Sequence, residues 1–137
     1  MQKSRILLAD DDQEDQSIIQ EAMESLDAGH IIMFADNGEQ LMDLLNKNFT
    51  PSDYPCLIVL DLNMPKMSGT QTLSKLKSDE KYKNIPVIIY STSINSLERE
   101  NCLLLGANSF ITKPVSFRES REIAKSFLQF CQSKSII

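Results

Sequence analysis

Short apolar runs alternate with longer amphipathic segments along almost all of this 137-residue chain. Runs that are nearly all apolar are typical of strands buried on both faces of a parallel sheet. The runs that predict strands are Ile6–Ala9, Ile31–Ala35, Cys56–Leu60, Val87–Tyr90 and Ser109–Thr112. Strands that alternate with helices imply right-handed crossovers, so the sequence predicts an α/β fold with helices on both faces of the sheet.

The segments between the runs carry apolar residues at helical spacing. The expected helices are Glu14–Leu26, Glu39–Asn46, Thr70–Lys77, Leu97–Leu105 and Phe117–Phe130. Gly106 follows the fourth of these segments as a helix stop. Ser116 precedes the fifth as an N-cap, and Glu119 completes the pattern of a capping box.

The length and composition predict one globular domain over residues 1–137, with a core from about residue 5 to 130. No linker and no output domain are expected. No apolar run approaches the ~20 residues of a membrane span, and the N-terminus does not resemble a signal peptide, so we expect a cytoplasmic protein without a membrane partner. The net charge of −5 argues against bulk binding to nucleic acid, which needs clustered Lys and Arg.

The chain has three cysteines, Cys56, Cys102 and Cys131. Their number is odd, their spacing matches no CxxC motif, and each stands in an apolar context. We therefore expect buried free thiols in a reducing compartment.

Polar side chains follow four of the five predicted strands. In an open parallel sheet, ligands bind beyond the carboxyl ends of the strands. The residues at these ends are Asp10, Asp11 and Asp12 after the first strand, Asp61 after the third, Ser91 and Thr92 after the fourth, and Lys113 after the fifth. Each feature alone is commonplace, because Asp caps helices and Ser or Lys-Pro occurs in turns. Their occurrence together at the strand ends favours a functional site.

The converging carboxylates need a counter-charge, and Mg²⁺ or another hard divalent cation suits oxygen ligands. Lys113 offers a second positive charge, and Ser91 offers a neutral hydrogen-bond donor. These parts could hold three phosphoryl oxygens while a carboxylate such as Asp61 acts as the nucleophile and forms an aspartyl-phosphate.

The same residues make the chain resemble the receiver domain of two-component response regulators. The resemblance rests on Ile6–Asp12 (ILLADDD), Leu60–Gly69 (LDLNMPKMSG), Pro86–Ser91 (PVIIYS) and Leu105–Phe117 (LGANSFITKPVSF). It covers about residues 5–130 and is similar to the single-domain regulators paired with bacterial phytochromes. It implies a flavodoxin-like (βα)5 sandwich with strand order 2-1-3-4-5, an order that also occurs in chemotaxis receivers.

The resemblance also implies a role for each matching residue. These roles are Asp61 as phosphoacceptor, Asp11 and Asp61 as metal ligands through their carboxylates, Asn63 as a metal ligand through its backbone carbonyl, Asp10 as the supporting acid at the metal, Ser91 as the switch hydroxyl and Lys113 as the phosphoryl-binding cation. Phe110 stands where the family has a rotating aromatic residue, often Tyr, and it lacks the hydroxyl group.

A phosphoprotein of this kind depends on partners. The only histidine, His30, precedes the second predicted strand, so the donor is expected to be a separate histidine kinase or histidine phosphotransfer protein. The expected output face comprises the fourth helix, the fifth strand and the fifth helix, which would contact a downstream target or a second copy in a homodimer. We expect no enzyme, with at most self-phosphotransfer and slow autodephosphorylation.

Three other interpretations compete. A phosphatase of the haloacid-dehalogenase type uses a similar inventory, but it needs a second Asp two residues after the nucleophile, where this chain has Asn63. A degenerate receiver would bind partners without phosphorylation, yet the acids, Ser91 and Lys113 are all present. A flavodoxin would need a phosphate-binding loop after the first strand, where three aspartates would repel a flavin phosphate.

Overall fold

A computed structural model describes residues 5–92 and 95–132. Its centre is a five-stranded parallel sheet in the order β2-β1-β3-β4-β5. The strands are β1 (Ile6–Ala9), β2 (Ile32–Ala35), β3 (Leu57–Leu60), β4 (Val87–Ser91) and β5 (Ser109–Thr112). The predicted fold class and strand order are confirmed. Two predicted strands begin one residue early, since Ile31 and Cys56 precede the observed starts, and β4 extends to Ser91.

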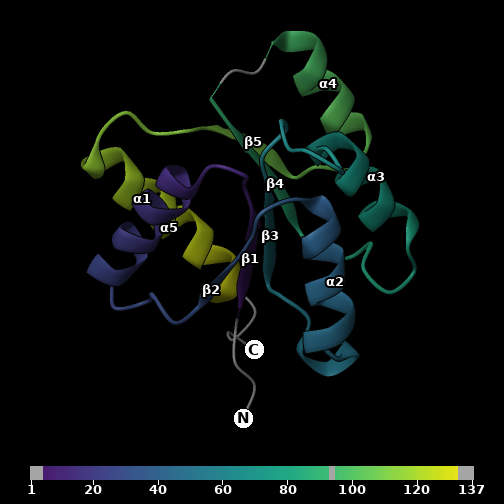
Figure 1. Cartoon of the computed structure of the whole chain (residues 1–137), viewed down its shortest axis with the longest axis horizontal. Coiled ribbons are helices and arrows are strands. Elements are labelled where there is room, and N and C mark those ends of the chain that lie inside the picture. The colour runs from purple at the N-terminus through teal and green to yellow at the C-terminus, as the bar shows by residue number, and fades with distance from the viewer. Residues whose placement is uncertain (1–4, 93–94, 133–137) are drawn as a thin grey trace.

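Helices cover both faces of the sheet, as predicted (Figure 1). The helices are α1 (Gln13–Ser25), α2 (Gly38–Asn48), α3 (Gly69–Ser78), α4 (Ser96–Leu104) and α5 (Phe117–Gln132), with a short 3-10 helix at Pro51–Asp53 that the sequence did not predict. In Figure 1, α1 and α5 lie on one side of the sheet, and α2, α3 and α4 lie on the other. None of the helices within the described residues is long and apolar enough to cross a membrane.

The apolar strands divide their side chains between two cores. In β1, Leu7 packs in the core beneath α2 and α3, whereas the adjacent Leu8 packs in the core beneath α1 and α5. Ile58 and Val59 in β3 divide in the same way. Because successive residues of a strand point to opposite faces, both faces of a doubly covered sheet need apolar residues. This explains why the strands read as continuous apolar runs.

The helix boundaries follow local signals in the sequence. Gly106 ends α4 with a φ of 111°, a left-handed conformation that favours glycine. Ser116 Oγ accepts a hydrogen bond from the Glu119 amide at 3.2 Å, as predicted for an N-cap. The Glu119 carboxylate instead accepts from the Val115 amide at 2.9 Å, so the reciprocal half of the predicted capping box is shifted by one residue.

The expectation of three free thiols is wrong for two of the cysteines. Cys56, just before β3, and Cys131, near the end of α5, form a disulfide, whereas Cys102 is a buried free thiol. Their Cα atoms lie 5.1 Å apart, within the usual range for a disulfide. The pair is 75 residues apart in sequence, and only the packing of α5 against the sheet brings the two residues together.

Candidate functional site

The carboxyl ends of β1 and β3 place two aspartates side by side in the interior. The Asp10 amide donates to the Ala35 carbonyl at 3.0 Å, and the Asp61 amide donates to the Ala9 carbonyl at 3.0 Å. These bonds continue the ladders of the sheet beyond the strands. Asp10 is fully buried and Asp61 is 5% exposed. Buried carboxylates are costly unless they are paired, so this edge of the sheet requires positive charge.

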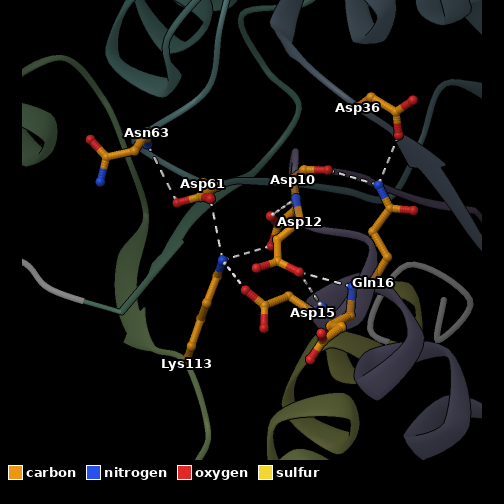
Figure 2. A network of polar contacts seen from close by, with 9 residues as sticks. Asp10, Asp12, Asp15, Gln16, Asp36, Asp61, Asn63 and Lys113 are labelled. Carbon is orange, nitrogen blue, oxygen red and sulfur yellow. Dashed lines mark hydrogen bonds and ion pairs between the residues drawn. The ribbon is translucent and has the colours of Figure 1, made fainter.

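Lys113, which follows β5, supplies that charge. Its amide donates to the Ser91 carbonyl at 3.0 Å, which fixes the backbone beside β4. Its ammonium Nζ lies 2.8 Å from Asp10 Oδ2, 2.7 Å from Asp15 Oδ2 and 3.2 Å from Asp61 Oδ2 (Figure 2). Asp15 and Asp61 accept hydrogen bonds from the ammonium, whereas Asp10 Oδ2 is an ion-pair partner that accepts no hydrogen bond from the described residues.

The electrostatics of the two most buried charges differ. Burial raises the pKa of Asp10 to about 6, although the neighbouring Lys113 and the Asp12 amide oppose this shift. Burial alone would lower the pKa of Lys113, but its contacts with Asp10 and Asp15 outweigh burial and raise that pKa. The lysine therefore stays charged, while burial makes the charged form of Asp10 less favourable than that of an exposed aspartate.

The aspartates that follow β1 have different structural roles. Asp12 caps α1, because its Oδ1 accepts hydrogen bonds from the Glu14 and Asp15 amides at 2.9 and 3.3 Å. Its own amide donates to Asp10 Oδ1 at 2.9 Å, so the cap also orients the buried carboxylate. Asp11 is exposed and faces the site from the same turn.

Three carboxylates can hold a divalent cation. One oxygen each from Asp10, Asp11 and Asp61 lies within 4.8 Å of the others, which suits ligation of a single hard ion. The cluster also carries more negative charge than Lys113 alone can neutralise. The residues therefore fit the predicted Mg²⁺ or a similar divalent cation. The Asn63 amide donates to Asp61 Oδ1 at 3.4 Å, so this residue adjoins the cluster as well.

Ser91 ends β4 next to Asp61. The residue is fully buried, and its Oγ has no hydrogen-bond partner among residues 5–92 and 95–132. A buried hydroxyl without a partner costs free energy, and such groups are rare in folded proteins. Its place at the carboxyl end of β4, the strand adjoining β3, puts this hydroxyl at the same edge of the sheet as Asp61.

The start of α3 lies close against the backbone of Asp61. The Gly69 amide donates to the Leu62 carbonyl at 3.0 Å, and a Cβ at Gly69 would overlap the Asp61 carbonyl oxygen. Glycine is required here for this close approach, although it also begins α3. Ser68 caps that helix by accepting from the Gln71 amide at 3.2 Å.

Phe110, the residue at the family's rotating aromatic position, lies in β5. It is half-buried against the core beneath α2 and α3, and the Arg99 guanidinium lies 5.9 Å from its ring centroid.

His30 is exposed and precedes β2, at the amino edge of the parallel sheet. Asp10 and Asp61 follow β1 and β3, at the carboxyl edge. His30 therefore lies away from the carboxylates, as predicted.

Asp15 is the part of the site that the sequence analysis missed. It lies in the first turn of α1, and its contact with Lys113 spans 98 residues of sequence. One signal could have found it, since the first turn after a strand lies over the carboxyl edge of a parallel sheet.

Comparison with known proteins places these features in a family. The response regulator receiver domain matches residues 6–125. CpxR, a transcriptional regulatory protein of Escherichia coli, is 35% identical over 116 residues, which are 85% of this chain and 45% of CpxR. The response regulator Rcp1 of Synechocystis is 28% identical over 127 residues, which are 91% of this chain and 86% of Rcp1. The chain thus spans less than half the length of CpxR but most of the length of Rcp1.

Solved structures agree with the fold. The phosphorylated cyanobacterial phytochrome response regulator RcpA is 32% identical with a TM-score of 0.82, and the match covers 97% of this chain and 96% of RcpA. The Mn²⁺-bound form of Rcp1 has a TM-score of 0.78 at 27% identity and covers 93% of this chain and 94% of Rcp1. The receiver prediction is therefore confirmed over the phosphatase and flavodoxin alternatives. The chain belongs to the response regulator receiver domain family of two-component systems.

Proposed function

We propose that the chain is a phosphoacceptor in which Asp61 takes a phosphoryl group from a histidine of a partner protein. Asp10, Asp11, Asp61 and the Asn63 backbone carbonyl would hold Mg²⁺, and Ser91 and Lys113 would bind the phosphoryl oxygens. The observation that carries the proposal is the position of Asp61, a nearly buried carboxylate 3.2 Å from Lys113 Nζ. The second support is Ser91, on the adjacent strand, whose buried hydroxyl has no hydrogen-bond partner within the described part of the chain.

The transfer itself exchanges one bond for another. The N–P bond of the phosphohistidine breaks and leaves its electron pair on the imidazole nitrogen, while an Asp61 carboxylate oxygen forms the new O–P bond. Lys113 and Ser91 would stabilise charge on the transferred oxygens by donating hydrogen bonds to them. A bound divalent cation would neutralise further charge on the phosphoryl group.

The proposal includes retention of the phosphate rather than rapid turnover. A phosphatase needs a general acid or base beside its nucleophile, and the residue two positions after Asp61 is Asn63, which cannot exchange a proton as a carboxyl group would. The chain would thus act as a signalling domain, with slow autodephosphorylation at most.

Phosphorylation would switch the surface formed by α4, β5 and α5. Ser91 would turn toward the new oxygens, and Phe110, which is half-buried, could move inward beneath the loop before α4. Exposed apolar side chains support this surface as a contact face, since Leu97 and Leu104 in α4 are 74% and 86% exposed, and Val115 in the loop between β5 and α5 is 90% exposed. Moving a two-state equilibrium from mostly off to mostly on requires about 5.5 kcal/mol, a sum that a few charge-assisted hydrogen bonds and repacking can reach.

The expected partners are a sensor histidine kinase or a histidine phosphotransfer protein, together with a downstream target. The likeness to the cyanobacterial phytochrome response regulator RcpA supports a kinase of the phytochrome type as donor. We further propose that residues 1–137 act as a single receiver domain in the cytoplasm, and that α4 and α5 provide the contacts of a homodimer.

Stoichiometry and turnover test this proposal together. Acetyl phosphate with Mg²⁺ should add one phosphoryl group per chain, and the modification should require the divalent cation. Multiple turnover of p-nitrophenyl phosphate at a rate typical of phosphatases would contradict the proposal.

A further inference from the structure

Lys113 makes three contacts, and they are not equivalent. Asp10 and Asp61 approach its ammonium from the ends of β1 and β3, and both side chains are almost completely buried. Asp15 approaches from the first turn of α1, and its side chain is 25% exposed. Its 2.7 Å distance to Nζ is nevertheless the shortest of the three, compared with 3.2 Å for Asp61.

The position of Asp15 is fixed by its helix rather than by the cation site. The Asp12 cap accepts the Asp15 amide at 3.3 Å, and a carboxylate in the first turn is favoured by the helix dipole. The carboxylate cluster that suits a divalent cation consists of Asp10, Asp11 and Asp61, and Asp15 is not part of it. Asp15 therefore interacts with the site through Lys113.

A phosphoryl group on Asp61 would need one donor of Lys113. Asp15 and Asp61 accept its hydrogen bonds, and Asp10 adds an ion pair at 2.8 Å, so three carboxylates surround the ammonium and an arriving phosphoryl oxygen displaces one of them. Releasing Asp10 would leave a fully buried carboxylate without a counter-charge, which is strongly unfavourable. Asp15 can release the lysine at lower cost, because water already reaches its carboxylate.

We propose that Asp15 is a positioning residue that retains Lys113 in the unphosphorylated protein and releases it to the phosphoryl group. This inference rests on the proposed role of Asp61 as phosphoacceptor. Asp15 thus competes with the incoming phosphoryl group for Lys113, and it sets how readily the site accepts that group.

The test measures binding of beryllofluoride, a phosphoryl mimic, in the presence of Mg²⁺ by ¹⁹F NMR. Asp15→Asn should lower the dissociation constant about fivefold, the size of a partly exposed ion pair. Asp15→Glu, which keeps the charge, should restore a dissociation constant close to that of the wild type. Glu14→Gln is the matched control, because Glu14 is an exposed acid in the same helical turn and its substitution changes the net charge equally.

Phosphorylation kinetics with phosphoramidate provide a second readout. Asp15→Asn should lower the phosphoramidate concentration that gives the half-maximal rate. The rate at saturating phosphoramidate should change by less than about twofold. If Asp15 only stabilised the fold, its substitution would not lower the half-saturating concentration while leaving the saturating rate nearly the same. If Asp15→Asn and Glu14→Gln shift beryllofluoride binding equally, or if neither shifts it, the positioning role is wrong. Wild-type protein that gains no phosphoryl group on Asp61 would instead contradict the proposed function.

Discussion

The Lys113 ammonium, which follows β5, lies 3.2 Å from the Asp61 carboxylate, which follows β3. With β4 between them, the two side chains meet only because the sheet is parallel and all its carboxyl ends share one edge. The lysine therefore holds together charges that would otherwise repel one another.

Removal of this cation should destabilise the metal-free protein. Lys113→Met leaves the buried Asp10 and Asp61 without a counter-charge, so we expect a loss of about 3 kcal/mol in the free energy of unfolding. Mg²⁺ should restore part of that loss. Urea unfolding with and without Mg²⁺ measures both effects. Lys125→Met is the control, since Lys125 pairs with Glu122 on the exposed surface and should cost less than about 1 kcal/mol.

The pH dependence of stability should report on Asp10. Burial raises its pKa from 3.8 in the unfolded chain to about 6 in the folded protein. Between these values the folded protein keeps a proton that the unfolded chain has released, so the stability of the metal-free protein falls as pH rises through this window. A shift of this size corresponds to about 3 kcal/mol.

Asp10→Asn should abolish that part of the pH dependence and raise the metal-free stability at neutral pH. Urea unfolding in EDTA from pH 4 to 7 provides the measurement. The same titration predicts that Mg²⁺ binds more weakly below pH 6, because protonated Asp10 no longer contributes charge to the cluster. An identical pH profile for the wild type and the Asn variant would contradict this account.

A side chain at position 69 should destabilise the protein. Gly69→Ala places a Cβ against the Asp61 carbonyl oxygen, and neither backbone segment can yield freely. We expect a loss of about 1–3 kcal/mol in stability, despite the higher helix propensity of Ala, together with slower phosphorylation. At Gly29 an added Cβ would meet the flexible side chains of Gln20 and Glu24, so Gly29→Ala should cost less in the same assay.

Much of the fold and the site could be predicted from the sequence. The apolar runs predict the sheet because the central strands are buried on both faces, and the residues after the strands predict the site because parallel strands end at one edge. The role of Asp15 depends on how α1 crosses that edge, so spacing alone could not reveal it. Pairing of Cys56 with Cys131 depends on how the end of α5 meets the start of β3.

The disulfide has a direct chemical consequence. Protein that is unfolded without reductant should be alkylated by iodoacetamide at Cys102 alone, and reductant should expose all three cysteines. Closing a loop of 75 residues restricts the unfolded chain, so Cys131→Ser should lower the free energy of unfolding by about 2–4 kcal/mol. Intact mass after alkylation measures the first effect. Three modified cysteines without reductant would show that the disulfide does not form.

The most direct test of the central claim compares the intact masses of wild type and Asp61→Asn after incubation with acetyl phosphate and Mg²⁺. The account predicts that the wild type gains the mass of one phosphoryl group and that Asp61→Asn gains none, although the variant remains folded. An equal mass gain in both proteins would show that Asp61 is not the phosphoacceptor.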